Sequence, residues 1–157
     1  MSAPAARPLT AGEIALGRAM FGDAVDYRAV GISRRKWAFF QPRETVMAPC
    51  GHIHFHPDGS RYRDDFAAGD LADQGLFLHE MTHVWQTQTR GLFYLPLMRH
   101  PFCRYGYDWQ PGRPFERYGL EQQAEIVRHA FLMRQGRTTA GKAPLAAYEA
   151  LLPFEII

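Results

Sequence analysis

The sequence predicts an α+β fold in which a small antiparallel sheet packs on a long helix and on a second helix. Three observations lead to this prediction. Residues 30–55 contain short apolar or alternating runs broken by turn residues, whereas residues 71–89 and 115–135 are long and free of proline. The chain has 157 residues, 46% hydrophobic and 22% charged, which is typical of one globular domain. We therefore expect a single domain over residues 10–157, preceded by a flexible lead-in over residues 1–9.

The first helix and the sheet are expected in the N-terminal third. Thr10 and Glu13 form a capping box ahead of several apolar residues, which predicts a short helix that ends at the following glycine. The apolar runs 37–40 and 45–48 predict strands, and the alternating segment 52–56 predicts the second arm of a hairpin near residues 45–55. Its period of two would place Ile53 and Phe55 on one face and His52, His54 and His56 on the other.

The remaining elements are expected to be helices joined by one irregular segment. Residues 71–89 predict a long helix that ends before Gly91. Residues 92–114 hold four prolines and many aromatic residues, which indicates an ordered, irregular connection. A helix should follow over residues 115–135, and a last short helix should run from Pro144 to about residue 152.

Composition argues against several classes of partner. The net charge of +2 is far from that of a dedicated nucleic-acid binder, and no apolar run approaches the length of a membrane span, so neither nucleic acid nor membrane is expected. The N-terminus lacks the apolar segment of a Sec-type signal peptide, which predicts a cytoplasmic protein, exported if at all by a specialised secretion system. Cys50 and Cys103 form no CxxC motif, so they predict neither a disulfide framework nor a thiolate metal site, although a single bridge stays open.

The motif His79-Glu80-Met81-Thr82-His83 lies within the long expected helix. Histidines four positions apart project from one face, where they can take two corners of a tetrahedral zinc site, with Glu80 beside the open corner. The alternative is a solvated helix face. Apolar residues surround the motif on nearly all sides, which indicates a buried helix whose polar groups need partners. These residues are Leu76, Phe77, Leu78, Met81, Val84 and Trp85. The sequence therefore predicts bound zinc.

Two carboxylates on the next expected helix are candidates to complete the site. A glutamate followed four residues later by a second acidic residue, as in Glu121 and Glu125, resembles the arrangement of the gluzincins. That resemblance implies that Glu121 is the third zinc ligand and that Glu125 supports one of the ligating histidines. Related zincins commonly carry Asp at the second position, which leaves the geometry of Glu125 open. Glu125 or His129 as the ligand, or a solvated pair of carboxylates, are the alternatives.

The motif also resembles a larger family. Residues 79–86 are similar to the HE(L/M)THVxQ signature of eCIS-core metallopeptidase-like domains, which occur in bacterial contractile-injection and toxin loci. From residue 9 to 135 the chain resembles short proteobacterial proteins called Vgr-related. The shared pieces are residues 9–16, 21–23, 39–42, 100–105 and 121–126. The resemblance implies a zincin-like, peptidase-like fold and a link to type VI secretion or a related injection system, whose components are possible partners.

The chemistry expected of such a site is hydrolysis of peptide bonds in a peptide or protein substrate. Zinc would be held by His79, His83 and Glu121, with Glu80 as the general base on the attacking water. A further donor should stabilise the developing oxyanion, and the sequence offers Tyr118, His129, Tyr105 and Tyr107 as candidates. The substrate of such an enzyme would add as a strand to the edge of the hairpin near residues 45–55.

Other interpretations of the same sequence stay open. A second metal at the row of His52, His54 and His56 is an alternative, but such alternation is also typical of a solvent-facing strand. Two other functions compete with the peptidase. One is a non-catalytic zinc-binding adaptor or chaperone module of a secretion locus, and the other is a secreted toxin hydrolase that cuts a non-protein amide.

Overall fold

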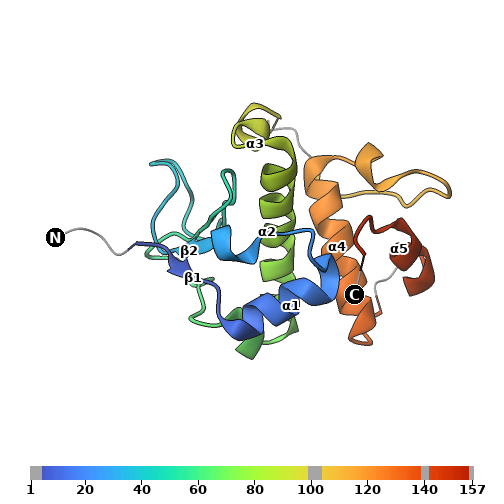
Figure 1. Cartoon of the computed structure of the whole chain (residues 1–157), viewed down its shortest axis with the longest axis horizontal. Coiled ribbons are helices and arrows are strands. Elements are labelled where there is room, and N and C mark those ends of the chain that lie inside the picture. The colour runs from blue at the N-terminus through green and yellow to red at the C-terminus, as the bar shows by residue number, and fades with distance from the viewer. Residues whose placement is uncertain (1–4, 99–103, 139–141, 156–157) are drawn as a thin grey trace.

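The structure is a computed structural model that describes residues 5–98, 104–138 and 142–155. Two long helices, α2 (Leu71–Arg90) and α4 (Leu120–Arg134), pack along each other at its centre (Figure 1). A small sheet lies on one side of α2, and α5 (Leu145–Leu151) lies on the far side of α4. Helices and a sheet therefore share one fold, and the prediction of an α+β class is confirmed.

The sheet is mixed rather than antiparallel. Its strands β1 (Arg7–Pro8), β2 (Gly31–Ser33) and β3 (Ile53–His54) lie in the order β1-β2-β3. The first pair is antiparallel and the second is parallel. The prediction of an antiparallel sheet is therefore wrong for β2 and β3, because the long connection between them carries the chain back to the start of β2 before β3 begins. Arg7 and Pro8, expected in the lead-in, belong to the sheet.

Two of the expected strands do not form. Residues 37–40 are bends and turns, and residues 45–48 contribute one isolated antiparallel bridge, between Met47 and His54. The buried side chain of Gln41 explains the difference. Its Oε1 accepts a hydrogen bond from the Trp37 N–H at 2.8 Å, and its Nε2 donates to the carbonyls of Thr45 and His54 at 2.8 and 2.9 Å. These are backbone groups that a strand partner would otherwise satisfy. Ile53 and Phe55, which were predicted to share one face, are both buried.

The first helix, α1 (Ala11–Phe21), forms as predicted. The Thr10 hydroxyl accepts from the Glu13 N–H at 3.0 Å, and the Glu13 carboxylate accepts from the Thr10 N–H at 2.9 Å. Glu13 is fully buried, and it also accepts from Arg7 at 2.9 Å and from the Phe66 N–H at 2.9 Å. One carboxylate thus joins β1, α1 and the 3-10 helix η2 (Phe66–Ala68).

The later helices differ from the prediction at two places. Residues 115–117 form a separate 3-10 helix, η3, and α4 begins only at Leu120, because Tyr118 and Gly119 are extended. A short helix that was not expected, α3 (Tyr94–Met98), lies in the proline-rich connection. Pro96 is tolerated there because it falls in the first helical turn, where a backbone N–H has no helical partner.

The metal-motif helix is buried as its apolar surroundings predict. All five residues of the motif are buried, and its neighbours Phe77, Leu78 and Val84 are at most 2% exposed. Stacked rings of Phe55, Phe66 and Phe77, with centroids 5.3 and 5.9 Å apart, join the residue after β3 and the 3-10 helix η2 to α2. Among the described residues, no helix is long and apolar enough to cross a bilayer.

Candidate metal centre

Three buried side chains converge where α2 meets the first turn of α4. His79 and His83 project from one face of α2, and Glu121 projects from α4 toward both. The Nε2 atoms of the histidines lie 3.2 and 3.1 Å from the same oxygen, Glu121 Oε2. The ligand atoms of the three residues all lie within 4.8 Å of one another. Glu121 is 1% exposed, so its charge is withdrawn from water.

This geometry fits a small divalent cation. Zinc–nitrogen and zinc–oxygen bonds of about 2.0–2.2 Å place neighbouring tetrahedral donors roughly 3.4 Å apart. The distances from Glu121 Oε2 to His79 Nε2 and to His83 Nε2, 3.2 and 3.1 Å, lie within a few tenths of an ångström of that spacing. Two imidazoles and one carboxylate are also a donor set that zinc takes in catalytic sites. The group can therefore bind a metal ion without large movement of the backbone.

A chain of amide side chains orients His83. Its Nδ1 lies 2.8 Å from Gln86 Oε1, an acceptor, so Nδ1 carries the hydrogen and Nε2 is left for a metal. The Gln86 Nε2 group donates to Gln123 Oε1 at 3.0 Å and to the Leu120 carbonyl at 3.1 Å. Gln123 in turn donates to the Tyr118 carbonyl at 2.9 Å. The chain fixes the ring of His83 and holds α2 against the start of α4.

We expect that replacing Gln86 with leucine lowers zinc affinity about 10- to 100-fold, because His83 loses the acceptor that sets its tautomer. A competition titration against a chromogenic chelator measures the change. Gln88→Leu is the matched control, since Gln88 lies on the same helix but bonds the backbone of Asp26. Equal affinities for wild type and Gln86→Leu would rule out the orienting role.

A second chain of contacts supports His79. Its Nδ1 lies 2.8 Å from Glu125 Oε1, and the other oxygen of Glu125 lies 3.5 Å from His129 Nε2. On its far side, His129 Nδ1 lies 2.6 Å from the Tyr107 hydroxyl, which is 2.7 Å from the Tyr148 hydroxyl. The contacts run from α2 through α4 to α5. Glu125 thus stands where a carboxylate would orient His79 through its second nitrogen.

Charges in the centre favour a protonated His79 when no metal is bound. Burial acts to lower the pKa of His79, but the hydrogen bonds with Glu121 and Glu125 and the charge of Glu80 outweigh it and raise the pKa to about 10. Burial acts to raise the pKa of Glu125, yet His79 holds it below its ordinary value. The pKa of His129 is lowered by burial, despite the opposing charge of Glu125. Any metal ion must therefore displace a proton from His79.

The stability of the metal-free protein is expected to fall as pH rises from about 6.5 toward about 10. The folded state holds the His79 proton up to about pH 10, whereas the unfolded chain releases it near 6.5, so the stabilisation is complete below 6.5 and lost above 10. Thermal melts in chelator, with His79→Gln as the reference for other titrating groups, measure the slope. Parallel curves for wild type and variant would contradict the raised pKa. Zinc affinity should change in the opposite direction and strengthen as pH rises.

A cavity of about 280 Å³ opens onto the metal group. Glu80, which is 6% exposed, lies in its wall beside the two histidines. The ring of Tyr105 stacks near the His79 ring at 6.1 Å and is half exposed. The other lining residues are Glu44, Thr45, Val46, Arg61, Leu76, Glu121, Glu125 and Arg128. The cavity therefore places four carboxylates, a phenol and two guanidinium groups around the same space.

The structure brings together only some of the predicted site residues. Tyr118 does not line the cavity, because its ring is buried and its hydroxyl accepts from the Gln110 N–H at 3.0 Å. His129 and Tyr107 also lie outside the lining, and they reach the metal group only through Glu125. Of the four candidate donors, Tyr105 is the one that the structure places in the cavity wall.

The roles of some other residues of the centre were not predicted from the sequence. Gln86 follows His83 by less than one helical turn, and that spacing was a usable signal. Arg61 and Glu44 enter the cavity from loops, and no sequence pattern marks them. No convergent metal group in the described ranges includes His52, His54 or His56. Cys50 is a free thiol, and Cys103 lies outside the described residues.

Comparisons with known proteins found a similar full-length protein and a similar solved domain. No family model matches the chain. The chain is 40% identical over 139 residues to the type VI secretion system spike protein VgrG2b of Pseudomonas aeruginosa, an alignment that covers 83% of this chain but 13% of that protein. The solved effector domain of Pseudomonas aeruginosa VgrG2b superposes with a TM-score of 0.77 and 34% identity, covering 97% of this chain and 88% of the domain.

Proposed function

The chain belongs to the family of the VgrG2b effector domain, and from this premise we propose that it is a zinc-dependent peptidase of the gluzincin type with a zincin-like fold. One observation carries the proposal. The two histidines of the HExxH motif and Glu121 converge below a cavity in whose wall Glu80 also lies. A zinc site that only stabilised the fold would have four protein ligands and no open position, and it would need no acid or base beside the metal.

The residues of the chain divide the chemistry among them. Zinc, when bound, supplies a Lewis acid that polarises a carbonyl and acidifies water. His79, His83 and Glu121 would hold it. Glu80 accepts the proton of the attacking water and returns it to the leaving amine nitrogen. Tyr105, the candidate donor that lies in the cavity wall, donates its hydroxyl hydrogen toward the oxyanion.

The substrate we propose is a peptide or protein segment in extended form. Thr45 and Val46 line the cavity, and the next residue, Met47, pairs with His54 through both backbone groups, at 3.1 and 2.7 Å. This short bridged segment is the edge along which an extended backbone would lie. Arg61, Arg128 and Glu44 add charged groups to the same wall, and these would favour substrates with polar side chains near the scissile bond.

The relationship to a spike-protein domain connects the chain to type VI secretion. We propose that the protein is made in the cytoplasm and delivered as an effector through such a system, with components of that system as partners. The matched part of VgrG2b is a small share of its length, 13%. The proposal therefore concerns the effector domain and not the spike.

Metal analysis and cleavage of a peptide library, performed on one fresh preparation, test the function. We expect stoichiometric zinc and cleavage that stops on chelation and returns with added zinc. Protein that holds zinc but cleaves nothing would support an adaptor or chaperone module instead. A preparation that cleaves cell-wall amides but not peptides would support the toxin hydrolase. Absence of stoichiometric metal would refute the proposal itself.

A further inference from the structure

The connection between β2 and β3 carries an exposed surface that the metal centre does not use. We call residues 34–43 the aromatic loop. Phe39 is 89% exposed, Phe40 60% and Trp37 37%, and the Phe40 ring contacts the other two edge to face. Leaving such rings in water costs free energy unless something covers them. Within the described chain nothing does, so the aromatic loop has the character of a binding surface.

The aromatic loop is held in a defined shape. The buried Gln41 side chain fixes Trp37 at one end and Thr45 at the other through the hydrogen bonds already described. One turn closes it further, with the Gln41 N–H donating to the Ala38 carbonyl at 3.0 Å, and the Lys36 ammonium donates to the Phe39 carbonyl at 3.4 Å. The exposed rings are therefore preorganised, and a partner would not bear the full entropy cost of ordering them.

Positive charge surrounds the exposed rings. Arg34, Arg35, Lys36 and Arg43 are all exposed, and the loop contains no acidic residue. A cavity of about 610 Å³ adjoins its first half and is lined by Arg7 together with Arg34, Arg35 and Lys36. The other lining residues are Ala5, Ile32, Pro57 and Tyr62, so no carboxylate shares the cavity wall.

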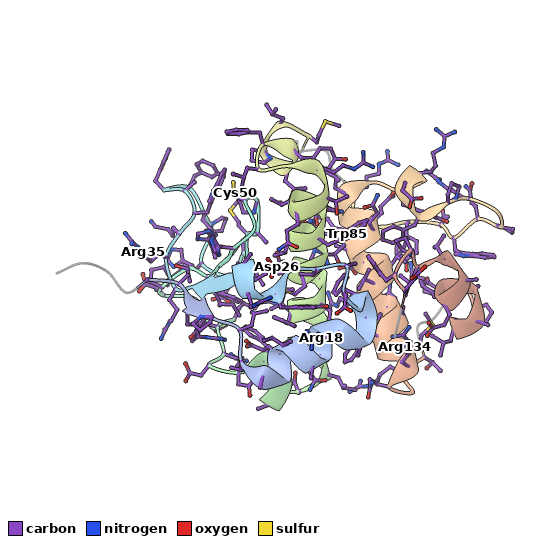
Figure 2. The ribbon with its side chains drawn as sticks, in the orientation of Figure 1. Arg18, Asp26, Arg35, Cys50, Trp85 and Arg134 are labelled. Carbon is purple, nitrogen blue, oxygen red and sulfur yellow. The ribbon has the colours of Figure 1, made fainter. Side chains whose placement is uncertain are left out.

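Two of these cations are available to a ligand. Arg7 is paired with Glu13, and Arg34 lies over the Tyr62 ring at 4.7 Å. Arg35 and Lys36 form no ion pair with the described residues, and Figure 2 shows Arg35 at the margin of the molecule, on the side away from α5. A cavity with free cations on its rim, next to exposed aromatic rings, attracts a group that is anionic at one end and apolar at the other.

We propose that the aromatic loop attaches the protein to the surface of a bilayer that contains anionic phospholipid. Aromatic rings favour the boundary between headgroups and acyl chains, and each nearby cation adds about 1 kcal/mol on an anionic surface. Three rings on one loop offer too little surface area for a stable protein–protein interface, which buries about 800 Å² per partner. We expected no membrane partner because the chain has no apolar run long enough to span a bilayer. Attachment to the bilayer surface does not require such a run.

The aromatic loop is directly followed in the chain by residues that line the cavity of the metal centre. Arg43 ends the aromatic loop, and the next three residues, 44–46, line the cavity above the metal group. Attachment through Phe39 and Phe40 would therefore bring that cavity close to the bilayer surface. Substrates held at or in a membrane would meet the site more often than free ones.

Vesicle sedimentation with the full chain tests the attachment. Vesicles of phosphatidylcholine alone are compared with vesicles holding about one third phosphatidylglycerol, at low and at high salt. We expect at least tenfold tighter binding to the anionic vesicles at low salt, falling as salt rises. Phe39→Ser with Phe40→Ser should weaken binding at least about tenfold, and Arg35→Gln with Lys36→Gln, which removes two cations worth about 1 kcal/mol each, should weaken it about 30-fold. Zinc content and melting temperature show that these exposed substitutions leave the fold unchanged.

Two matched controls distinguish binding by the aromatic loop from non-specific adsorption of the protein to vesicles. Phe93→Ser with Leu97→Ser removes exposed apolar groups in α3 and just before it, and Arg117→Gln with Arg137→Gln removes two exposed charges elsewhere. Both pairs should bind vesicles as the wild type does. Loss in either control equal to that of the loop variants would overturn the proposal, as would binding to polyglutamate without binding to vesicles. Zinc binding and cleavage are measured separately, so failure of the proposed peptidase leaves this test intact.

Discussion

Replacing Glu80 with glutamine is expected to leave the protein folded and loaded with zinc, and to reduce peptide cleavage about 10²- to 10⁴-fold. Glutamine keeps the size of the side chain but cannot accept the proton of the attacking water. Glu80 lies in the cavity wall beside the two histidines and is not among the three convergent ligand groups. The metal should therefore stay bound, so loss of turnover is separated from loss of metal. Initial rates on the best library peptide and zinc content by mass spectrometry measure both effects.

Glu116→Gln supplies the matched control for this substitution. Glu116 is exposed on η3 and does not line the cavity, so this substitution removes one carboxylate charge away from the site. Its rate should equal that of the wild type. A Glu80→Gln variant that cleaves at the wild-type rate would exclude Glu80 as the base, even if zinc is present in both. Cleavage that falls together with zinc content would instead assign Glu80 to the support of the metal.

Replacing Glu121 with glutamine is expected to weaken zinc binding more than any other single change outside the two histidines, by about 10³-fold or more. Loss of a group that orients a ligand typically costs 10- to 100-fold, and Glu121 is itself one of the three donors. The variant should also be less stable in chelator. Removing one partner of a buried ion pair costs about 3–5 kcal/mol, and the cost here should lie at the lower end because a histidine can release its proton.

Chelator melts and zinc titrations measure the two effects of Glu121→Gln. A loss of about 3 kcal/mol corresponds to a melting temperature lower by roughly 6–12 °C for a chain of this size. Glu125→Gln is the informative comparison, since Glu125 contacts His79 but lies outside the convergent group. Its zinc affinity should fall by no more than about 100-fold. Wild-type affinity in Glu121→Gln would assign the third ligand to another residue.

The helices could be predicted from the sequence better than the sheet could. Thr10 with Glu13, the long apolar face of residues 71–90 and Gly91 are local signals, and local signals decide where a helix begins and ends. Strand pairing is not local. The hydrogen bonds of the Gln41 side chain hold residues 37–45 out of the sheet, and neither apolar content nor alternation reveals that a glutamine will be buried there.

The candidate site was predictable where its residues share a helix. His79, Glu80 and His83 lie within five positions, and a period of 3.6 places the two histidines on one face. Glu121 required an analogy, because its distance from the motif depends on how α4 packs on α2. Tyr105 could not be chosen over Tyr118 from sequence. Tyr105 lies in the proline-rich connection and Tyr118 was expected in the helix that follows, and neither position indicates whether the ring faces the cavity. Only the packing of the Tyr118 ring in the core excludes it from the cavity.

The chain of contacts from His79 to Tyr148 has a consequence for how the protein matures. All three convergent ligands are present once α4 has been synthesised, but the hydroxyl of Tyr148 comes from α5. The last link of this chain, from Tyr107 to Tyr148, can form only after α5 has docked against α4. A nascent chain that stops short of α5 would carry the three ligands together with Glu125 and His129, but without the hydroxyl at the end of the chain of contacts. The contacts that support His79 are therefore completed later in synthesis than those that orient His83.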